Sequence, residues 1–215
     1  MTRPLMLGTV LALSACLGCM RPSPAVVFHT LHPLRPQEGA PTPRSSMAVE
    51  VLALRLPEVL QRPQLVTAQG PDHLGLDETH RWGNPLGQEM QRVLVENLSQ
   101  LLGSDAVVAS PYGERVKAAY RVEVDVQRCD ARPGALTLQA TWMVSRPSGG
   151  QALLLRKTTL EEPLKGPDPD ALVEAHSQVL AALSREIASG LKTLAGEGQE
   201  GPAVKILEKG PAPPR

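Results

Sequence analysis

Five histidines and three cysteines are the residues of this sequence best suited to metal binding or nucleophilic chemistry. His73, Asp77 and His80 could converge on a metal ion if their segment folded back on itself. The two histidines are seven residues apart, however, whereas an i, i+4 spacing places two ligands on one helix face. His176 falls on an apolar helical stripe, which favours a hydrogen-bonded core histidine over a catalytic base. These residues therefore predict neither a metal site nor a dissociable cofactor.

Catalytic motifs are missing from the sequence. It contains no Gly-X-Ser-X-Gly nucleophile elbow and no glycine-rich phosphate loop. Asp168 and Asp170 are placed to interact with the dipole at the N-terminal end of a helix, which is favoured over a catalytic pair. We therefore expect a protein that is not an enzyme.

Cys16 is the cysteine with the clearest chemical role. Arg3 precedes the apolar run Leu5–Leu13, which is shorter than the roughly 20 residues of a membrane-spanning helix and fits a secretory signal. The run ends in Leu13-Ser14-Ala15-Cys16, which resembles the bacterial lipobox. At a lipobox the thiol is alkylated with diacylglycerol and the signal is cut before the cysteine. We expect residues 1–15 to be removed and Cys16 to carry covalent lipid, palmitate among its acyl chains.

Two questions about the cysteines stay open. The first segment could be an ordinary signal peptide with a cysteine by chance, and Cys19 is a less suitable lipidation site. Cys129 follows a strand and has no base near it in the sequence, so a free or partly buried thiol is expected. A disulfide between Cys19 and Cys129 is the alternative.

The composition narrows the class of protein. Among 215 residues, 22 Lys+Arg balance 22 Asp+Glu, and only 2% are aromatic. A neutral chain with few stacking residues is a poor nucleic-acid binder, so no nucleic acid partner is expected. Proline gathers at both ends. It predicts a lipidated tether over 16–46, with a possible edge strand at 25–31, and a disordered tail over 196–215.

Hydrophobic periodicity predicts the elements of one domain at 47–195. Strands are expected at 47–56, 65–68 and 73–82, followed later by a three-stranded meander over 116–160. One helix is expected to start with Asn84 as N-cap and Pro85 as its first residue, and to end at Gly103. A longer helix starts at Asp168 and ends at Gly196. The predicted fold class is α+β, a mainly antiparallel sheet with two principal helices packed on one face.

A string of motifs links the sequence to a known family. Residues 56–66 read Leu-Pro-Glu-Val-Leu-Gln-Arg-Pro-Gln-Leu-Val, and Arg81-Trp82 stands shortly before Pro85-Leu86. These motifs, with parts of 93–102, 122–126, 142 and 177–188, resemble the ABC-type transport auxiliary lipoproteins. Those are the PqiC-like outer-membrane subunits of MCE-type lipid transport systems. The chain departs from the family pattern at Phe28, Gly83 and Cys129, which bears on the subtype of system that it serves.

The resemblance implies a non-catalytic lipoprotein that is anchored in the outer membrane and faces the periplasm. Its implied partners are the MCE-domain subunit of a lipid transporter, outer-membrane lipid and further copies of itself. Leu17 after Cys16, in place of Asp, agrees with export to the outer membrane. A generic envelope lipoprotein with an assembly or cell-wall role is the alternative.

The motif residues could contact a partner or shape the fold. They are Leu56, Pro57, Arg62, Pro63, Arg81 and Trp82. In the structural interpretation, Leu56-Pro57 ends a strand and Arg62-Pro63 keeps the chain extended. Trp82 would then pack onto the first turn of the helix that follows it.

Overall fold

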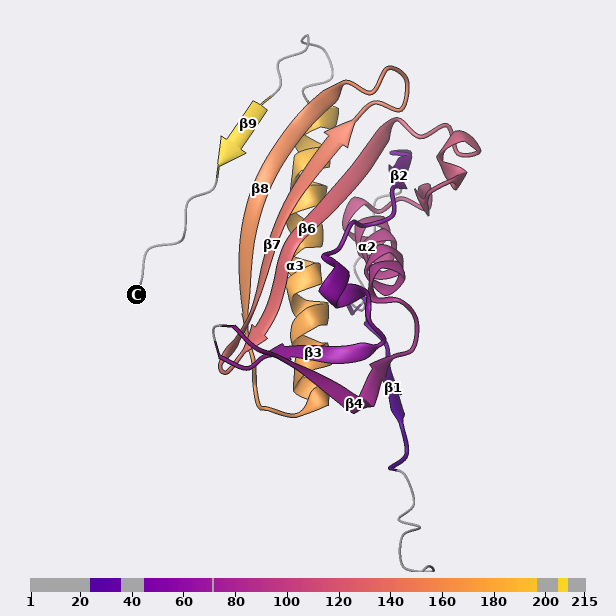
Figure 1. Ribbon diagram of the computed structural model, residues 1–215. Coiled ribbons are helices and arrows are strands. Elements are labelled where there is room, and N and C mark those ends of the chain that lie inside the picture. The colour runs from indigo at the N-terminus through magenta and orange to yellow at the C-terminus, as the bar shows by residue number, and fades with distance from the viewer. Residues whose placement is uncertain (1–23, 36–44, 71, 197–204, 209–215) are drawn as a thin grey trace, which may run out of the picture.

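The computed structural model describes residues 24–35, 45–70, 72–196 and 205–208. These residues form two sheets and two long helices (Figure 1). The larger sheet has the strand order β5-β2-β6-β7-β8-β9, and the smaller one has the order β1-β4-β3. The strands of the larger sheet are β2 (Val49–Val51), β5 (Val107–Ala109), β6 (Tyr120–Arg132), β7 (Ala135–Ser145), β8 (Ala152–Pro163) and β9 (Lys205–Glu208). Those of the smaller sheet are β1 (Val27–His29), β3 (Gln64–Ala68) and β4 (Leu74–Trp82).

The central meander forms where the sequence alternates between apolar and polar residues. β6 pairs antiparallel with β7, and β7 pairs antiparallel with β8. Val122, Val124 and Trp142 are buried on one face. The residues that alternate with them, such as Glu123 and Asp125, are half-buried on the other face. This alternation gives one core-facing and one polar face, as expected for an antiparallel sheet.

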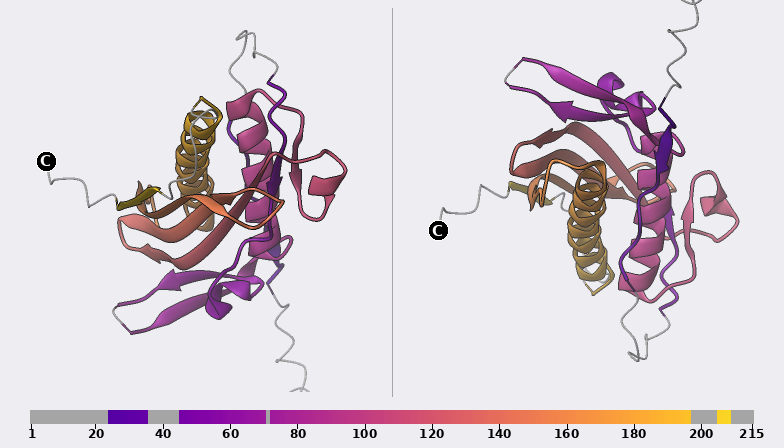
Figure 2. Two further views of the ribbon diagram at one scale, coloured as in Figure 1. Left: turned by 90° about the horizontal axis from the view of Figure 1, so that it is seen from above. Right: turned by 90° about the horizontal axis from the view of Figure 1, so that it is seen from below.

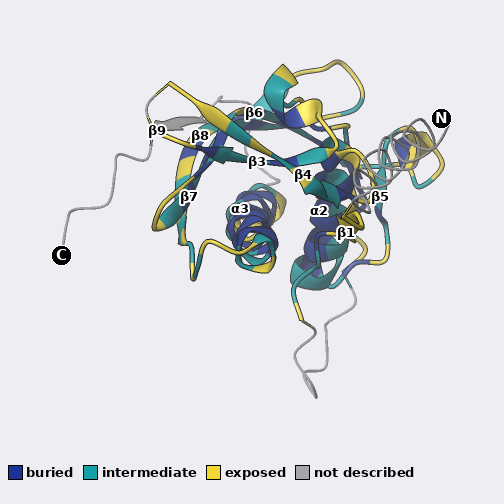
Figure 3. Ribbon diagram, turned by 60° about the horizontal axis from the view of Figure 1, so that its bottom comes forward, coloured by how far each residue is buried: buried dark blue, intermediate teal, exposed yellow. Residues whose placement is uncertain are grey.

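Two helices cover the apolar face of this sheet. The helix α2 (Leu86–Leu102) and the helix α3 (Pro169–Gly196) lie side by side against it (Figure 3). Leu94, Leu98, Leu183 and Ile187 are fully buried in the single core that results. The fold is a single α+β domain, which confirms the predicted class. No helix in the described part of the chain is long and apolar enough to cross a membrane.

The small sheet lies across the end of the domain at which α3 begins (Figures 1 and 2). β3 and β4 form an antiparallel hairpin, and β1 adds to β4 in parallel with Val27 opposite His80. The predicted edge strand near residue 27 is therefore present. Its partner is a segment 53 residues later, which no local pattern in the sequence indicates.

The structure corrects the predicted strand at 47–56. Only Val49–Val51 form β2, and the chain then runs irregularly beside β6. The N–H groups of Leu52 and Arg55 still donate to the carbonyls of Val122 and Val124, at 2.9 and 3.1 Å. Parallel pairing of β2 with both β5 and β6 also makes the large sheet mixed at this edge.

The start of α2 differs from its prediction as well. Pro85 is the N-cap position, and Asn84 makes no capping hydrogen bond. Its side-chain amide instead donates to Oε1 of Glu89 at 2.8 Å. At the other end Gly103 stops the helix in the left-handed conformation (φ 60°), as predicted. Asp168 accepts a 2.8 Å hydrogen bond from the N–H of Ala171 and caps α3.

The predicted tail and the predicted tether both contain ordered elements. Lys205–Glu208 form β9, parallel to β8, within the region predicted as a disordered tail. Within the predicted tether, Leu31 is 2% exposed and packs in the core. The proline content suggested a solvated linker, but apolar Leu31 and its neighbours are held between the helices.

Candidate functional site

The motif residues converge where the chain enters α2. The short 3₁₀ helix η2 (Glu58–Gln61) follows Pro57, and the N–H of Leu60 donates to the carbonyl of Pro57 at 2.9 Å. The N–H of Trp82 donates to the carbonyl of Pro63 at 2.7 Å. The end of β4 is thereby tied to the segment after η2. Motifs that are 19 residues apart in sequence, at Pro63 and Trp82, thus lie side by side.

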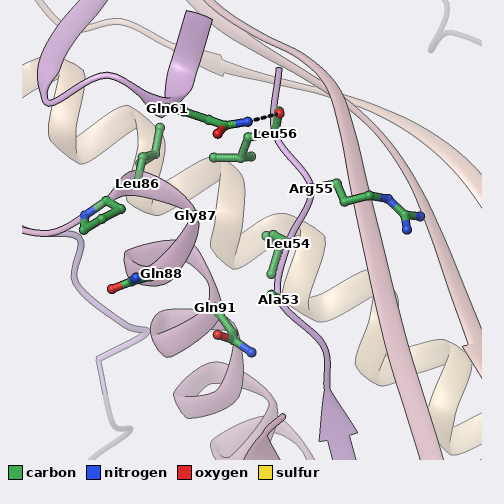
Figure 4. Close-up of a pocket in the computed structure, with 10 residues that line it drawn as sticks. Ala53, Leu54, Arg55, Leu56, Gln61, Leu86, Gly87, Gln88 and Gln91 are labelled. Carbon is green, nitrogen blue, oxygen red and sulfur yellow. Dashed lines mark hydrogen bonds between the residues drawn. The ribbon is translucent and has the colours of Figure 1, made fainter. Parts of the chain in front are cut away.

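A pocket of about 540 Å³ opens beside these motifs, between residues 53–56 and the first turns of α2 (Figure 4). Its lining residues are Ala53, Leu54, Arg55, Leu56, Gln61, Pro85, Leu86, Gly87, Gln88 and Gln91. The lining combines leucine and proline side chains with three amides. Four of the lining residues, Leu56, Gln61, Pro85 and Leu86, belong to the motifs that the sequence singled out.

Hydrogen bonds fix the polar walls of the pocket. Nε2 of Gln61 donates to the carbonyl of Leu56 at 3.0 Å, which Figure 4 shows as a dashed line. Nε2 of Gln91 donates to the carbonyl of Val51, also at 3.0 Å. Arg55 points toward the strands and away from α2, with its Nε 3.6 Å from Oδ1 of Asp125. The lining offers apolar contact and amide hydrogen bonds but no nucleophile and no carboxylate.

The remaining motif residues divide between surface and core. Arg62 and Pro63 are exposed. Trp82 is buried, and its ring meets His176 of α3 edge-on at 5.3 Å between centroids. The guanidinium of Arg81 lies 3.7 Å from the carboxylate of Glu78. Trp82 therefore helps to join the small sheet to α3, whereas Arg62 and Pro63 are free to contact a partner.

The histidines pair with each other and with acids. Nε2 of His29 lies 2.9 Å from Nδ1 of His80, and Nδ1 of His29 lies 3.6 Å from Asp170. No group of three metal-ligating side chains occurs within the described ranges. Burial alone would raise the pKa of the Asp77 carboxyl, but hydrogen bonds from Thr79 and His80 lower it. Asp77 thus stabilises the stretch of β4 at which the register with β3 shifts, while His73 is exposed.

His176 and Cys129 are buried in the core. Nδ1 of His176 lies 2.8 Å from the carbonyl of Leu172, which matches the predicted hydrogen-bonded core histidine. Burial lowers the pKa of His176, although its backbone hydrogen bond acts in the opposite direction. Cys129 is a free thiol with 4% exposure, and burial with the nearby Asp130 raises its pKa to about 12. Cys16 and Cys19 lie outside the described residues.

The N-terminal segment docks between the two helices through side-chain acceptors. The main-chain N–H groups of Leu31, His32 and Leu34 donate to Glu89, Ser177 and Asn97, at 3.2, 3.3 and 2.7 Å. Asn97 also donates to Ser184 at 3.0 Å, which links α2 directly to α3. Sequence reasoning missed this docking. Its signal was the polar Glu89 and Asn97 on an otherwise apolar helix face.

Charge pairs strengthen the docked segment. NH2 of Arg92 donates to Oε2 of Glu89 at 2.8 Å and to the carbonyl of Leu31 at 2.6 Å. Burial alone would raise the pKa of Glu89, but hydrogen bonds from Arg92, Asn84 and Leu31 lower it. On the other helix, Nε2 of His32 lies 2.8 Å from Oε2 of Glu174. The segment between the candidate lipid site and the domain is thus bound to both helices.

Comparison with known proteins identifies relatives for most of this domain. The model of the family described as "ABC-type transport auxiliary lipoprotein component" matches residues 29–188. The crystal structure of an uncharacterized protein is 26% identical, with a TM-score of 0.60 over 70% of this chain and 95% of its own. Protein XCC0632 from Xanthomonas campestris is 18% identical, with a TM-score of 0.61 over 82% of this chain and 98% of its own. No match was found among curated proteins.

Proposed function

The chain belongs to the ABC-type transport auxiliary lipoprotein component family, and from that premise we propose that it anchors an MCE-type lipid transport system to the outer membrane. In this proposal Cys16 carries the lipid, and the domain faces the periplasm. The residues before Cys16 support the anchor, because they combine a short apolar signal with small side chains at the cut. The protein then acts by binding and not by catalysis.

The pocket beside α2 is the proposed contact site for the MCE-domain subunit. The observation that carries this assignment is the convergence of Leu56, Gln61, Pro85 and Leu86 on one hollow. Apolar floors with amide walls suit a peptide chain, because amides can pair with its main-chain groups. Exposed Arg62 and Pro63 extend the same surface beyond the pocket.

Co-purification from detergent-solubilised membranes tests the proposal. An arginine in place of exposed Ala53 would fill the pocket without entering the core. We expect Ala53→Arg to reduce the amount of MCE-domain subunit recovered with the protein. Ala195→Arg is the matched control, because Ala195 is exposed at the far end of α3. Its recovery should equal that of the unchanged protein.

The same preparation distinguishes the other possibilities. Recovery of the protein without any MCE-domain subunit would contradict the proposal and favour a generic envelope lipoprotein. Equal loss with both arginine variants would contradict the pocket as the contact site. Light scattering on the purified protein measures whether it is a homo-oligomer, which the proposal also includes.

A further inference from the structure

We propose that the first two residues of β1 and the residue before them form a lipid-contacting edge, in addition to the covalent anchor. The edge consists of Val26, Val27 and Phe28, which are 40%, 45% and 66% exposed. Phe28 is the single phenylalanine of the chain. Three consecutive exposed apolar side chains are costly in water, and their burial would recover that free energy. This inference rests on the proposed lipid anchor at Cys16.

The position of the edge in the chain identifies its occupant as a membrane. Seven residues lie between Cys16 and Pro24, the first described residue. Even a fully extended chain spans at most about 3.6 Å per residue, so Pro24 stays within roughly 30 Å of the anchor point. Figure 1 shows β1 at the end of the domain from which the chain leads toward its N-terminus. A lipid surface is therefore always close to this edge.

The exposure pattern also favours lipid over a protein partner. Successive side chains of a strand point to opposite faces, so Phe28 points away from Val27. A protein that packs on one face of the small sheet would leave the other face exposed. An apolar medium can cover both faces at once. Side chains on an edge strand such as β1 can insert to a shallow depth into a lipid surface.

Few charged groups surround the edge. Arg81 lies in register with Phe28 on the neighbouring strand, and its guanidinium is 3.7 Å from Glu78. Exposed Asp170 lies 3.6 Å from His29 of β1. The apolar side chains and the short chain that leads to Cys16 therefore carry the assignment to a lipid surface.

A fluorescent label at the edge tests this proposal in the lipidated protein. The full chain is produced with Cys19→Ser and Phe28→Cys and labelled with a nitrobenzoxadiazole dye. Acylated Cys16 cannot react, and Cys129 is buried with its pKa raised to about 12. The protein is reconstituted in phosphatidylethanolamine and phosphatidylglycerol vesicles with or without brominated chains. Tyr112→Cys, at a 51% exposed site of η3 (Tyr112–Glu114), is the control.

Quenching by brominated lipid distinguishes the outcomes. We expect the dye at position 28 to be quenched several times more strongly than the dye at position 112. Equal quenching at both positions would overturn the lipid-contacting edge. A blue-shifted but unquenched dye at position 28 would overturn it in favour of a protein partner or a second copy. Failure of fatty-acid labelling at Cys16 would instead contradict the anchor, and it is measured separately on the same protein.

Discussion

The main-chain N–H of Leu31 donates a hydrogen bond to Oε2 of Glu89 at 3.2 Å, across 58 residues of sequence. The carboxylate of Glu89 is nearly inaccessible, and Asn84 and Arg92 also donate to it. One buried acid therefore joins the N-terminal segment to the first turn of α2. Together with the pairing of β1 and β4, this contact attaches the N-terminal segment to the domain.

Replacement of this acid should destabilise the domain. Glu89→Ala removes three hydrogen bonds and leaves the buried main-chain N–H of Leu31 without this acceptor, whereas exposed Asn84 can turn to water. We expect the free energy of unfolding to fall by about 1–3 kcal/mol, as measured by urea denaturation. Glu96→Ala is the control, because Glu96 binds the same Arg92 at 2.9 Å but is 41% exposed. Its loss should cost less than about 1 kcal/mol, and equal losses would contradict a special role for Glu89.

A second prediction concerns the contact between α3 and the sheet. An added Cβ at Gly190 would lie 2.7 Å from Cδ2 of Leu154 and 3.0 Å from the ring of Trp142. Alanine normally stabilises a helix interior relative to glycine. Here we expect Gly190→Ala to lower the free energy of unfolding by about 1–3 kcal/mol, because the core is overpacked.

A glycine of the other helix provides the control for this substitution. At Gly87 the added Cβ would lie 3.4 Å from Cδ1 of Leu56, which is an ordinary contact with a flexible side chain. The free energy of unfolding of Gly87→Ala should equal or exceed that of the unchanged protein, because no overpacking offsets the helical preference for alanine. A stabilised Gly190→Ala variant would show that α3 can move away from the sheet at little cost.

Strong periodicity made the helices and the meander predictable. Local patterns determine these elements. The apolar residues at helical spacing are buried on one face of α2 and of α3, and the alternating apolar residues are buried on one face of β6 and of β7. Gly103 ended its helix as predicted because only the local conformation matters there. Pairing between distant segments leaves no such pattern. The pairing of β1 with β4 could therefore not be predicted from the sequence.

The candidate site was predictable only in part. The motif residues Leu56 and Trp82 were singled out from the sequence, but their separation into pocket and core depends on tertiary packing. The segment around Leu31 was predicted as a tether because prolines surround it. Side-chain acceptors on α2 and α3 bind this segment. The sequence shows that such a polar residue lies on an apolar helix face, but it does not show which distant segment the residue binds.

Lipidation is expected to depend on Cys16 alone. Cys16→Ser removes the thiol that would be alkylated, so the precursor should keep its signal and incorporate no labelled fatty acid. Cys19→Ser is the matched control, since it alters a thiol three residues later. It should be processed and labelled normally. Persistent label in the Cys16→Ser variant would contradict the anchor assignment.

The buried imidazole of His176 should make stability depend on pH. Burial lowers the pKa of His176 in the folded state below its ordinary value of 6.5. As the pH falls below 6.5, the unfolded chain binds a proton at this position while the folded chain does not, so stability is lost. The loss approaches about 1.4 kcal/mol per pH unit for one group. Urea denaturation between about pH 7.5 and pH 5 measures it.

His176→Leu separates this contribution from that of the other histidines. The variant loses the hydrogen bond to Leu172 at every pH, which shifts its stability by a constant amount. It also loses the protonation difference, so its stability should fall less steeply than that of the unchanged protein below pH 6.5. His29, His32 and His80 are present in both proteins and cancel in the comparison. Parallel curves over this range would show that His176 is protonated in the folded domain as readily as in the unfolded chain.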